Sequence, residues 1–103
     1  PKGTYLGIVS LSSGLLRATE VIIHSLRGEQ VLVMTAQLTD TYKINAIVRS
    51  ARVIICDQAS FETVKVSVQA NRDEIIRPPQ LLCCENYIGA ESINLLKREL
   101  GLK

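Results

Sequence analysis

Hydroxyl, carboxylate and amide side chains follow the apolar segments of this chain, at positions where they could bind a small polar ligand. Residues 10–14 hold three serines and a glycine immediately ahead of a helical pattern. The free N–H groups and the positive dipole end of a helix N-terminus attract a carboxylate or a phosphate. The same serines could instead cap the helix and satisfy the backbone of the turn. The candidate ligand-binding residues are Ser10, Ser12, Ser13, Gly14, Asp57, Ser60 and Asn86.

The loops after the first and third apolar runs resemble two kinds of phosphoryl-transfer site. Asp57 follows this run, as the phosphoacceptor of a response-regulator receiver does, but that chemistry needs Mg²⁺ and further carboxylates after the first strand. This chain has serines there instead. A phosphocarrier needs a cysteine nucleophile in that first loop, whereas Cys56 lies at the third run without a basic neighbour. We therefore expect Asp57 to cap the next helix or to orient a polar loop.

The single histidine does not complete a catalytic triad. His24 lies about three turns into the first predicted helix, away from Ser13, given a rise of about 1.5 Å per residue. A Ser13–His24–Asp57 arrangement is therefore not expected, and Glu85 alone is no pair of carboxylates for acid–base work. The residues predict a domain that is not an enzyme and that uses neither a metal nor a cofactor.

The composition indicates one soluble domain over residues 1–103. Of the 103 residues, 47% are hydrophobic and 21% are charged, and no apolar stretch is long enough to suggest contact with a membrane. The net charge of +2 is scattered along the chain, and only 4% of the residues are aromatic. These features disfavour direct binding of nucleic acid.

The three cysteines indicate a reducing compartment, which we take to be the cytoplasm. Their number is odd, and Cys83 and Cys84 are neighbours in the sequence, too close for the usual disulfide geometry. No CxxC pair is present for a redox or zinc site. We expect all three cysteines to be small buried hydrophobic residues.

Continuous apolar runs alternate with stretches of helical periodicity. Such runs are typical of strands that are covered on both faces. Strands are predicted over residues 4–9, 30–36, 52–56 and 80–84. Helices are predicted over residues 15–26 after an N-cap at Ser12 or Ser13, over a stripe of Ile44, Ile47, Val48 and Ala51 after an N-cap at Thr39 or Asp40, and over residues 90–100.

The segment between the third and fourth strands is ambiguous. Phe61, Val64 and Val68 fit a helix capped by Ser60, whereas the valines at 64, 66 and 68 also alternate like a strand. The preceding strand–helix units favour the helix. Residues 71–79 contain arginines and two prolines, and a solvated loop is a simpler interpretation of them than a binding or dimer surface.

Strands that alternate with helices imply right-handed crossovers. We therefore predict an α/β fold of the flavodoxin-like type, with a mainly parallel sheet of four or five strands and helices on both faces. Ligands of such sheets bind outside the carboxyl ends of the strands. This rule selects four loops, at residues 10–14, 37–40, 57–60 and 85–87.

The succession YLGIVSLSSGLLRATEVI, VLVMTAQ, ARVIICDQASFETV and IIRPPQLLCCENYIGAESINLLKREL resembles the C-terminal half of some bacterial GntR-type transcriptional regulators. The resemblance implies a compact α/β domain, similar to one lobe of a periplasmic binding protein. It also implies an N-terminal winged-helix DNA-binding domain, which is not in this chain from Pro1 onward. No particular ligand is implied, so the candidate site residues depend on the strand-end rule.

The working hypothesis is a regulatory domain that senses an effector, forms a cytoplasmic homodimer and contacts DNA only through the missing winged helix. A small anionic metabolite is the expected effector, bound at the serine-rich turn. A domain that only dimerises is a close second interpretation. The alternative from another class is a flavodoxin-like phosphocarrier or a receiver-like signalling domain.

Overall fold

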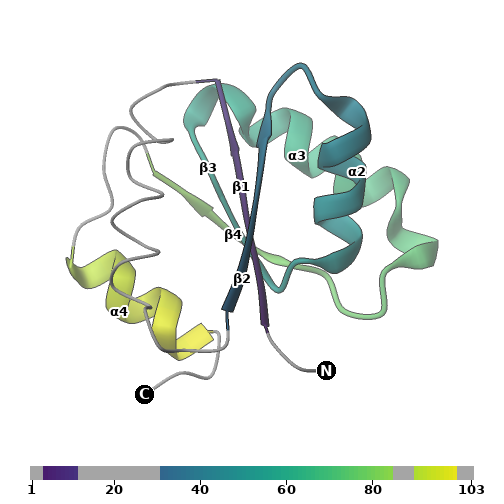
Figure 1. The fold of residues 1–103 in the computed structure, drawn as a ribbon. Coiled ribbons are helices and arrows are strands. Elements are labelled where there is room, and N and C mark those ends of the chain that lie inside the picture. Colours follow the sequence, from purple (N-terminus) through teal and green to yellow (C-terminus); the bar gives the residue numbers. More distant parts are fainter. Residues whose placement is uncertain (1–3, 12–30, 85–89, 100–103) are drawn as a thin grey trace.

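A computed structural model of the protein describes residues 4–11, 31–84 and 90–99. Four parallel strands form one sheet at the centre of the fold (Figure 1). The strands are β1 (Thr4–Ser10), β2 (Val31–Gln37), β3 (Val53–Cys56) and β4 (Gln80–Cys83), in the spatial order β2-β1-β3-β4. Every neighbouring pair is parallel. The predicted α/β fold with a mainly parallel sheet is therefore confirmed.

Helices cover both faces of this sheet. Figure 1 shows α2 (Thr41–Ser50) and α3 (Gln58–Ala70) on one side and α4 (Ala90–Glu99) on the other, while the short 3-10 helix η1 (Arg72–Glu74) follows α3. Successive side chains of a strand point to opposite faces. Leu6 and Ile8 of β1 therefore pack in one core with Leu96 of α4, whereas Val9 packs in a second core with α2 and α3. The helix predicted over residues 15–26 lies outside the described residues.

The prediction that all four strands are covered on both faces is correct for the two central strands and wrong for the two edge strands. Every residue of β3 is buried, as is β1 from Leu6 onward. In β2, by contrast, Leu32 and Thr35 are exposed, and both ends of β4 are exposed. An apolar run indicates burial in general, but it does not indicate whether a strand has a neighbour on one side or on two.

An aspartate caps the N-terminus of α2 and of α3. Asp40, one of the two predicted caps of α2, accepts a hydrogen bond from the Lys43 N–H at 3.1 Å. The ambiguous segment is a helix, because Val64 is buried while Val66, two residues later, is exposed, as is Lys65 between them. A strand would place the valines at 64 and 66 on the same face.

Most of the loop over residues 71–79 is open to solvent. Arg72 and Arg77 are both exposed, as expected for a solvated loop. Within residues 4–11, 31–84 and 90–99, no helix has the length and apolar character that crossing a membrane would require.

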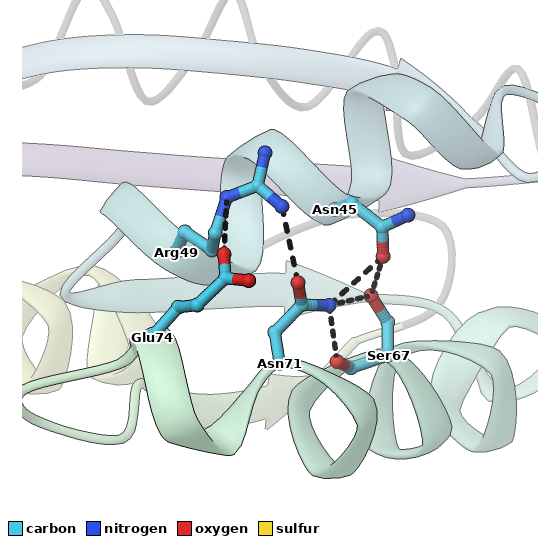
Figure 2. Close-up of polar contacts among 5 residues, drawn as sticks. All are labelled: Asn45, Arg49, Ser67, Asn71 and Glu74. Atoms are coloured by element: carbon cyan, nitrogen blue, oxygen red, sulfur yellow. Dashed lines mark hydrogen bonds and ion pairs between the residues drawn. The ribbon is translucent and has the colours of Figure 1, made fainter.

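A polar network joins α2 to the end of α3 (Figure 2). The Asn71 amide donates to Asn45 Oδ1 at 3.0 Å and to the Ser67 carbonyl at 2.7 Å. Ser67 Oγ also donates to Asn45 Oδ1 at 2.7 Å, and Arg49 Nη1 donates to Asn71 Oδ1 at 3.0 Å. Arg49 makes a longer ion pair, of 3.7 Å, with the mostly exposed Glu74. Asn71, the C-cap of α3, makes the largest number of these bonds, and Ser67 links α3 to α2 directly.

Replacing Asn71 with alanine should lower the free energy of unfolding by about 2 kcal/mol, because partly buried groups on Asn45 and Arg49 lose their partner. Replacing Glu74 with alanine is the control, and should cost at most about 0.5 kcal/mol, as is usual for an exposed ion pair. Urea denaturation followed by circular dichroism measures both. Equal effects of the two substitutions would show that the network contributes no more than the surface ion pair.

Candidate functional site

The strand order reverses beside β1, since the chain passes from β1 to β2 on one side and later returns to β3 on the other. In open parallel sheets, ligands bind at the carboxyl ends of the strands at such a point. Ser10 ends β1, and Asp57 directly follows β3, which is the parallel neighbour of β1. Two of the predicted site residues therefore meet at the point where the fold favours ligand binding.

Asp57 connects the two strand ends. The residue is buried, with 2% of its surface exposed. Oδ2 accepts hydrogen bonds from Ser10 Oγ at 2.9 Å and from the Leu11 N–H at 3.0 Å, and Oδ1 accepts from the Ser60 N–H at 3.0 Å. A buried carboxylate is tolerated when it is hydrogen-bonded in this way. The sequence-based expectation that Asp57 caps the next helix or orients a polar loop describes both of its roles here.

The N-cap of α3 is Asp57, and the prediction that Ser60 caps this helix is wrong. The helix begins at Gln58, and the Asp57 backbone is extended, with φ −82° and ψ 171°. Ser60 therefore lies in the first turn, where its N–H is one of the donors that an N-cap side chain satisfies. Its own Oγ is buried and has no hydrogen-bond partner among the described residues. This hydroxyl is a polar group at the strand ends with its hydrogen-bonding capacity unused.

The structure thus brings three predicted residues, Ser10, Asp57 and Ser60, into one buried cluster. The other four, Ser12, Ser13, Gly14 and Asn86, lie outside the described residues. His24 lies there as well.

A cavity of about 660 Å³ lies further along the same edge of the sheet, between the end of β2 and the first turn of α2. Register places Ser10 beside Gln37, and the Leu38 N–H donates to the Ser10 carbonyl at 3.3 Å. The cavity therefore adjoins the Ser10 corner. Its lining is mostly polar, and consists of Thr35, Ala36, Gln37, Thr39, Asp40, Thr41 and Lys43.

These lining residues were not among the predicted site residues. The strand-end rule selects residues 37–40 as a candidate loop, but this loop lacks the cluster of serines that makes residues 10–14 a candidate anion-binding turn. Lys43 lies within α2, and its position at the cavity follows from the first turn of that helix folding back beside β2. Lys43 follows the Asp40 cap by three residues, and this spacing would have placed it in the first turn of the helix, near the end of β2.

Cys56 is poorly suited to act as a nucleophile. Burial, together with nearby Cys83, Asp57 and Cys84, raises the pKa of the Cys56 thiol to about 12. The thiolate is the reactive form of cysteine, so this thiol stays protonated and unreactive near neutral pH. Among the described residues, moreover, no group of three or more histidine, cysteine, aspartate or glutamate side chains is placed to hold a metal ion.

The prediction that all three cysteines are buried is correct only for Cys56. Cys83 is exposed, and its Sγ contacts Gln58 Oε1 at 3.3 Å, while Cys84 is half-buried against the core beneath α4. Both follow from the edge position of β4, which leaves one side of the strand open. None of the three forms a disulfide.

A parallel sheet with this strand order and a polar carboxyl edge defines an open α/β domain. Residues 1–85 match the family described as the cyanobacterial PlmA-type GntR regulator, C-terminal domain. Because the match spans most of the chain, the chain belongs to this family, and the predicted resemblance to GntR-type C-terminal domains is confirmed. Its role is therefore that of a domain of a transcription regulator. No protein of curated function matches the chain.

Proposed function

We propose that this domain senses a small anionic metabolite and holds two copies of a GntR-type regulator together as a homodimer. A winged-helix domain of the same regulator would contact DNA, and the α/β domain would set the distance between two such winged helices. A regulator of this kind acts where the chromosome is, which in a bacterium is the cytoplasm. The domain would carry out no reaction of its own.

The observation that carries the sensing role is the buried Ser60 hydroxyl at the strand ends, which has no hydrogen-bond partner among the described residues. A buried polar group without a hydrogen bond costs about 1–3 kcal/mol. Such groups are rare in native proteins, and a bound water or ligand is a common explanation. Since Ser60 adjoins the Asp57 carboxylate, a ligand at this corner would complete a polar cluster that the fold has already assembled.

The charge of the ligand follows from what surrounds this corner. Asp57 already accepts from Ser10, Leu11 and Ser60, and a second negative charge next to it would be repelled. The anionic group should therefore lie toward the part of the cavity where Lys43 supplies a positive charge and threonine hydroxyls can donate, away from the Asp40 carboxylate that also lines it. We assign Ser12, Ser13, Gly14 and Asn86 to the same edge on sequence grounds. Asp57 is then a positioning residue rather than a direct ligand of the anion.

Binding would act on the dimer. A ligand shifts an equilibrium between two dimer arrangements only if it binds one of them more tightly. The loops at the carboxyl edge come from the connections that follow β1 and β3. A ligand that bridges them could therefore favour one relative position of these elements.

A thermal-shift screen of phosphorylated sugars, dicarboxylates and nucleotides tests the proposal. A ligand at about 100 times its Kd stabilises the folded state by about 2.7 kcal/mol, which raises the Tm of a domain of this size by roughly 10 °C or more. We expect the Lys43→Met variant and the Ser12→Ala/Ser13→Ala double variant to lose most of this shift. Arg72→Met, an exposed cation in η1, is the control and should keep it.

Three outcomes would contradict the proposal. A dimer that responds to no compound of these classes would favour a domain that only dimerises. A full thermal shift in the Ser12→Ala/Ser13→Ala variant would show that the serine-rich turn is not part of the binding site. A full thermal shift in the Lys43→Met variant would show that the cavity is not part of the binding site.

A further inference from the structure

We propose that two copies of this domain pair through the outer edge of β2, with their β2 strands antiparallel across a two-fold axis. This inference rests on the dimerisation part of the proposed function and names the surface responsible. The occupant is a second copy of this chain, because an open strand edge offers a row of backbone donors and acceptors that another strand satisfies best.

The outward-facing groups of β2 can be identified from its pairing with β1. The Leu38 N–H points to β1, since it donates to the Ser10 carbonyl. Backbone groups alternate in direction along a strand, so those of Met34 and Ala36 also point to β1, and those of Val33, Thr35 and Gln37 point away from it. In the described part of the chain, β2 is an edge strand and no residue pairs with its outer side.

This edge lacks the features that usually protect an edge from pairing. Native proteins shorten their edge strands or place charges and prolines on them. The opposite edge follows this rule, because β4 has only four residues and comes directly after Pro79. β2 has seven residues, VLVMTAQ, with neither a charge nor a proline, and Leu32 is 51% exposed.

The strand is also compatible with itself. A two-fold axis at Met34 places Thr35 opposite Val33 of the second copy and Gln37 opposite Val31 of the second copy. All these residues have outward-facing backbone groups, so each pair exchanges hydrogen bonds in the usual antiparallel pattern. Because the strand is uncharged, no like charges face each other across the axis. The contact is isologous, so it closes as a dimer.

The expected interface is modest in size. A strand of seven residues is about 23 Å long, and its edge alone buries less than the roughly 1,200 Å² of a typical stable complex. Leu32 lies on the face of the sheet that α2 covers, because Met34 and Ala36 on that face pack against α2. We therefore expect a dimer that dissociates on dilution.

Analytical ultracentrifugation of the chain over a concentration series tests this interface. Thr35→Lys places two lysines on the same face at about 7–8 Å across the axis, and should raise the dimer dissociation constant at least tenfold, with partial recovery in high salt. Thr35→Pro removes an outward-facing N–H that the monomer does not use, which an edge strand tolerates, and should also prevent pairing. Thr63→Lys, at an exposed position of α3, is the matched control and should leave the constant unchanged.

The outcomes separate this inference from the proposed function. A wild-type chain that is monomeric at every concentration would overturn both the interface and the dimerisation role. A dimeric wild-type chain whose dissociation constant is unchanged by Thr35→Lys would overturn the β2 interface alone. Circular dichroism verifies that each variant is folded, and Thr35→Lys decides the question if Thr35→Pro does not fold. Because Thr35 also lines the cavity, effector binding is judged by thermal shift on the wild-type chain and on the Lys43 and serine variants, and not on the Thr35 variants.

Discussion

Replacing Asp57 with alanine should lower the free energy of unfolding by about 3–5 kcal/mol. The substitution removes the N-cap of α3, which is typically worth about 1 kcal/mol. It also removes the acceptor of the buried Ser10 hydroxyl, at about 1–3 kcal/mol, and the acceptor of the partly buried Leu11 N–H, at about 1 kcal/mol. A loss of this size is a large part of the 5–15 kcal/mol that stabilises a typical native protein. Urea denaturation of the purified variants measures it.

Asp40→Ala is the matched control, because Asp40 caps α2 through a single bond to the Lys43 N–H. It should cost only about 1 kcal/mol. Asp57→Asn should lie between the two, since one amide oxygen remains to accept from three donors. If Asp57→Ala and Asp40→Ala were equally destabilising, the bonds from Asp57 to Ser10 and Leu11 would contribute nothing beyond an ordinary cap.

The second large effect is expected at Gly7, in the middle of β1 beneath α2. A Cβ atom at this position would collide with Ile47 Cγ2, and would lie 3.4 Å from Ala51 Cβ and 3.5 Å from Ile54 Cγ1. Because these neighbours are buried on all sides, they have little room to move. Gly7→Ala should therefore cost about 2–3 kcal/mol through overpacking, and Gly7→Val should cost more.

A double-mutant cycle tests the cause of this effect. Ile47→Leu removes the methyl group that would collide, while it conserves the side-chain volume, and alone should cost less than about 1.5 kcal/mol. In the Ile47→Leu background, Gly7→Ala should cost at least about 1 kcal/mol less than in the wild type. Additive effects of the two substitutions would show that Ile47 is not what restricts position 7.

Most of the fold could be predicted from local patterns. The continuous apolar runs marked β1 to β4, and the 3.6-residue spacing of Ile44, Ile47 and Val48 marked the buried face of α2. The choice of a helix over a strand for α3 depended on the succession of strand–helix units rather than on its valines. The neighbours of each strand were not predictable, because apolar runs of similar composition form both the central strand β3 and the edge strand β2.

The candidate site was predictable only in part. The strand-end rule places Ser10 and Asp57 at one edge from the sequence alone, because parallel strands end on the same side of a sheet. It did not indicate that the Asp57 carboxylate would accept hydrogen bonds from the Ser10 hydroxyl and the Leu11 N–H. Nor did it indicate that Ser60 would lie inside the helix with its hydroxyl buried, because a shift of the helix start by a few residues decides that.

The amino-acid sequence by itself determined the types and order of the elements, the family resemblance and the edge of the sheet where polar side chains gather. These properties arise from periodicity and backbone preference over a few neighbouring residues. Only the tertiary structure decided which strands became edges, which donors Asp57 satisfies and where the cavity beside Lys43 opens. Ser10 and Asp57 are 47 positions apart, and such contacts form only after the order of the strands has brought them together.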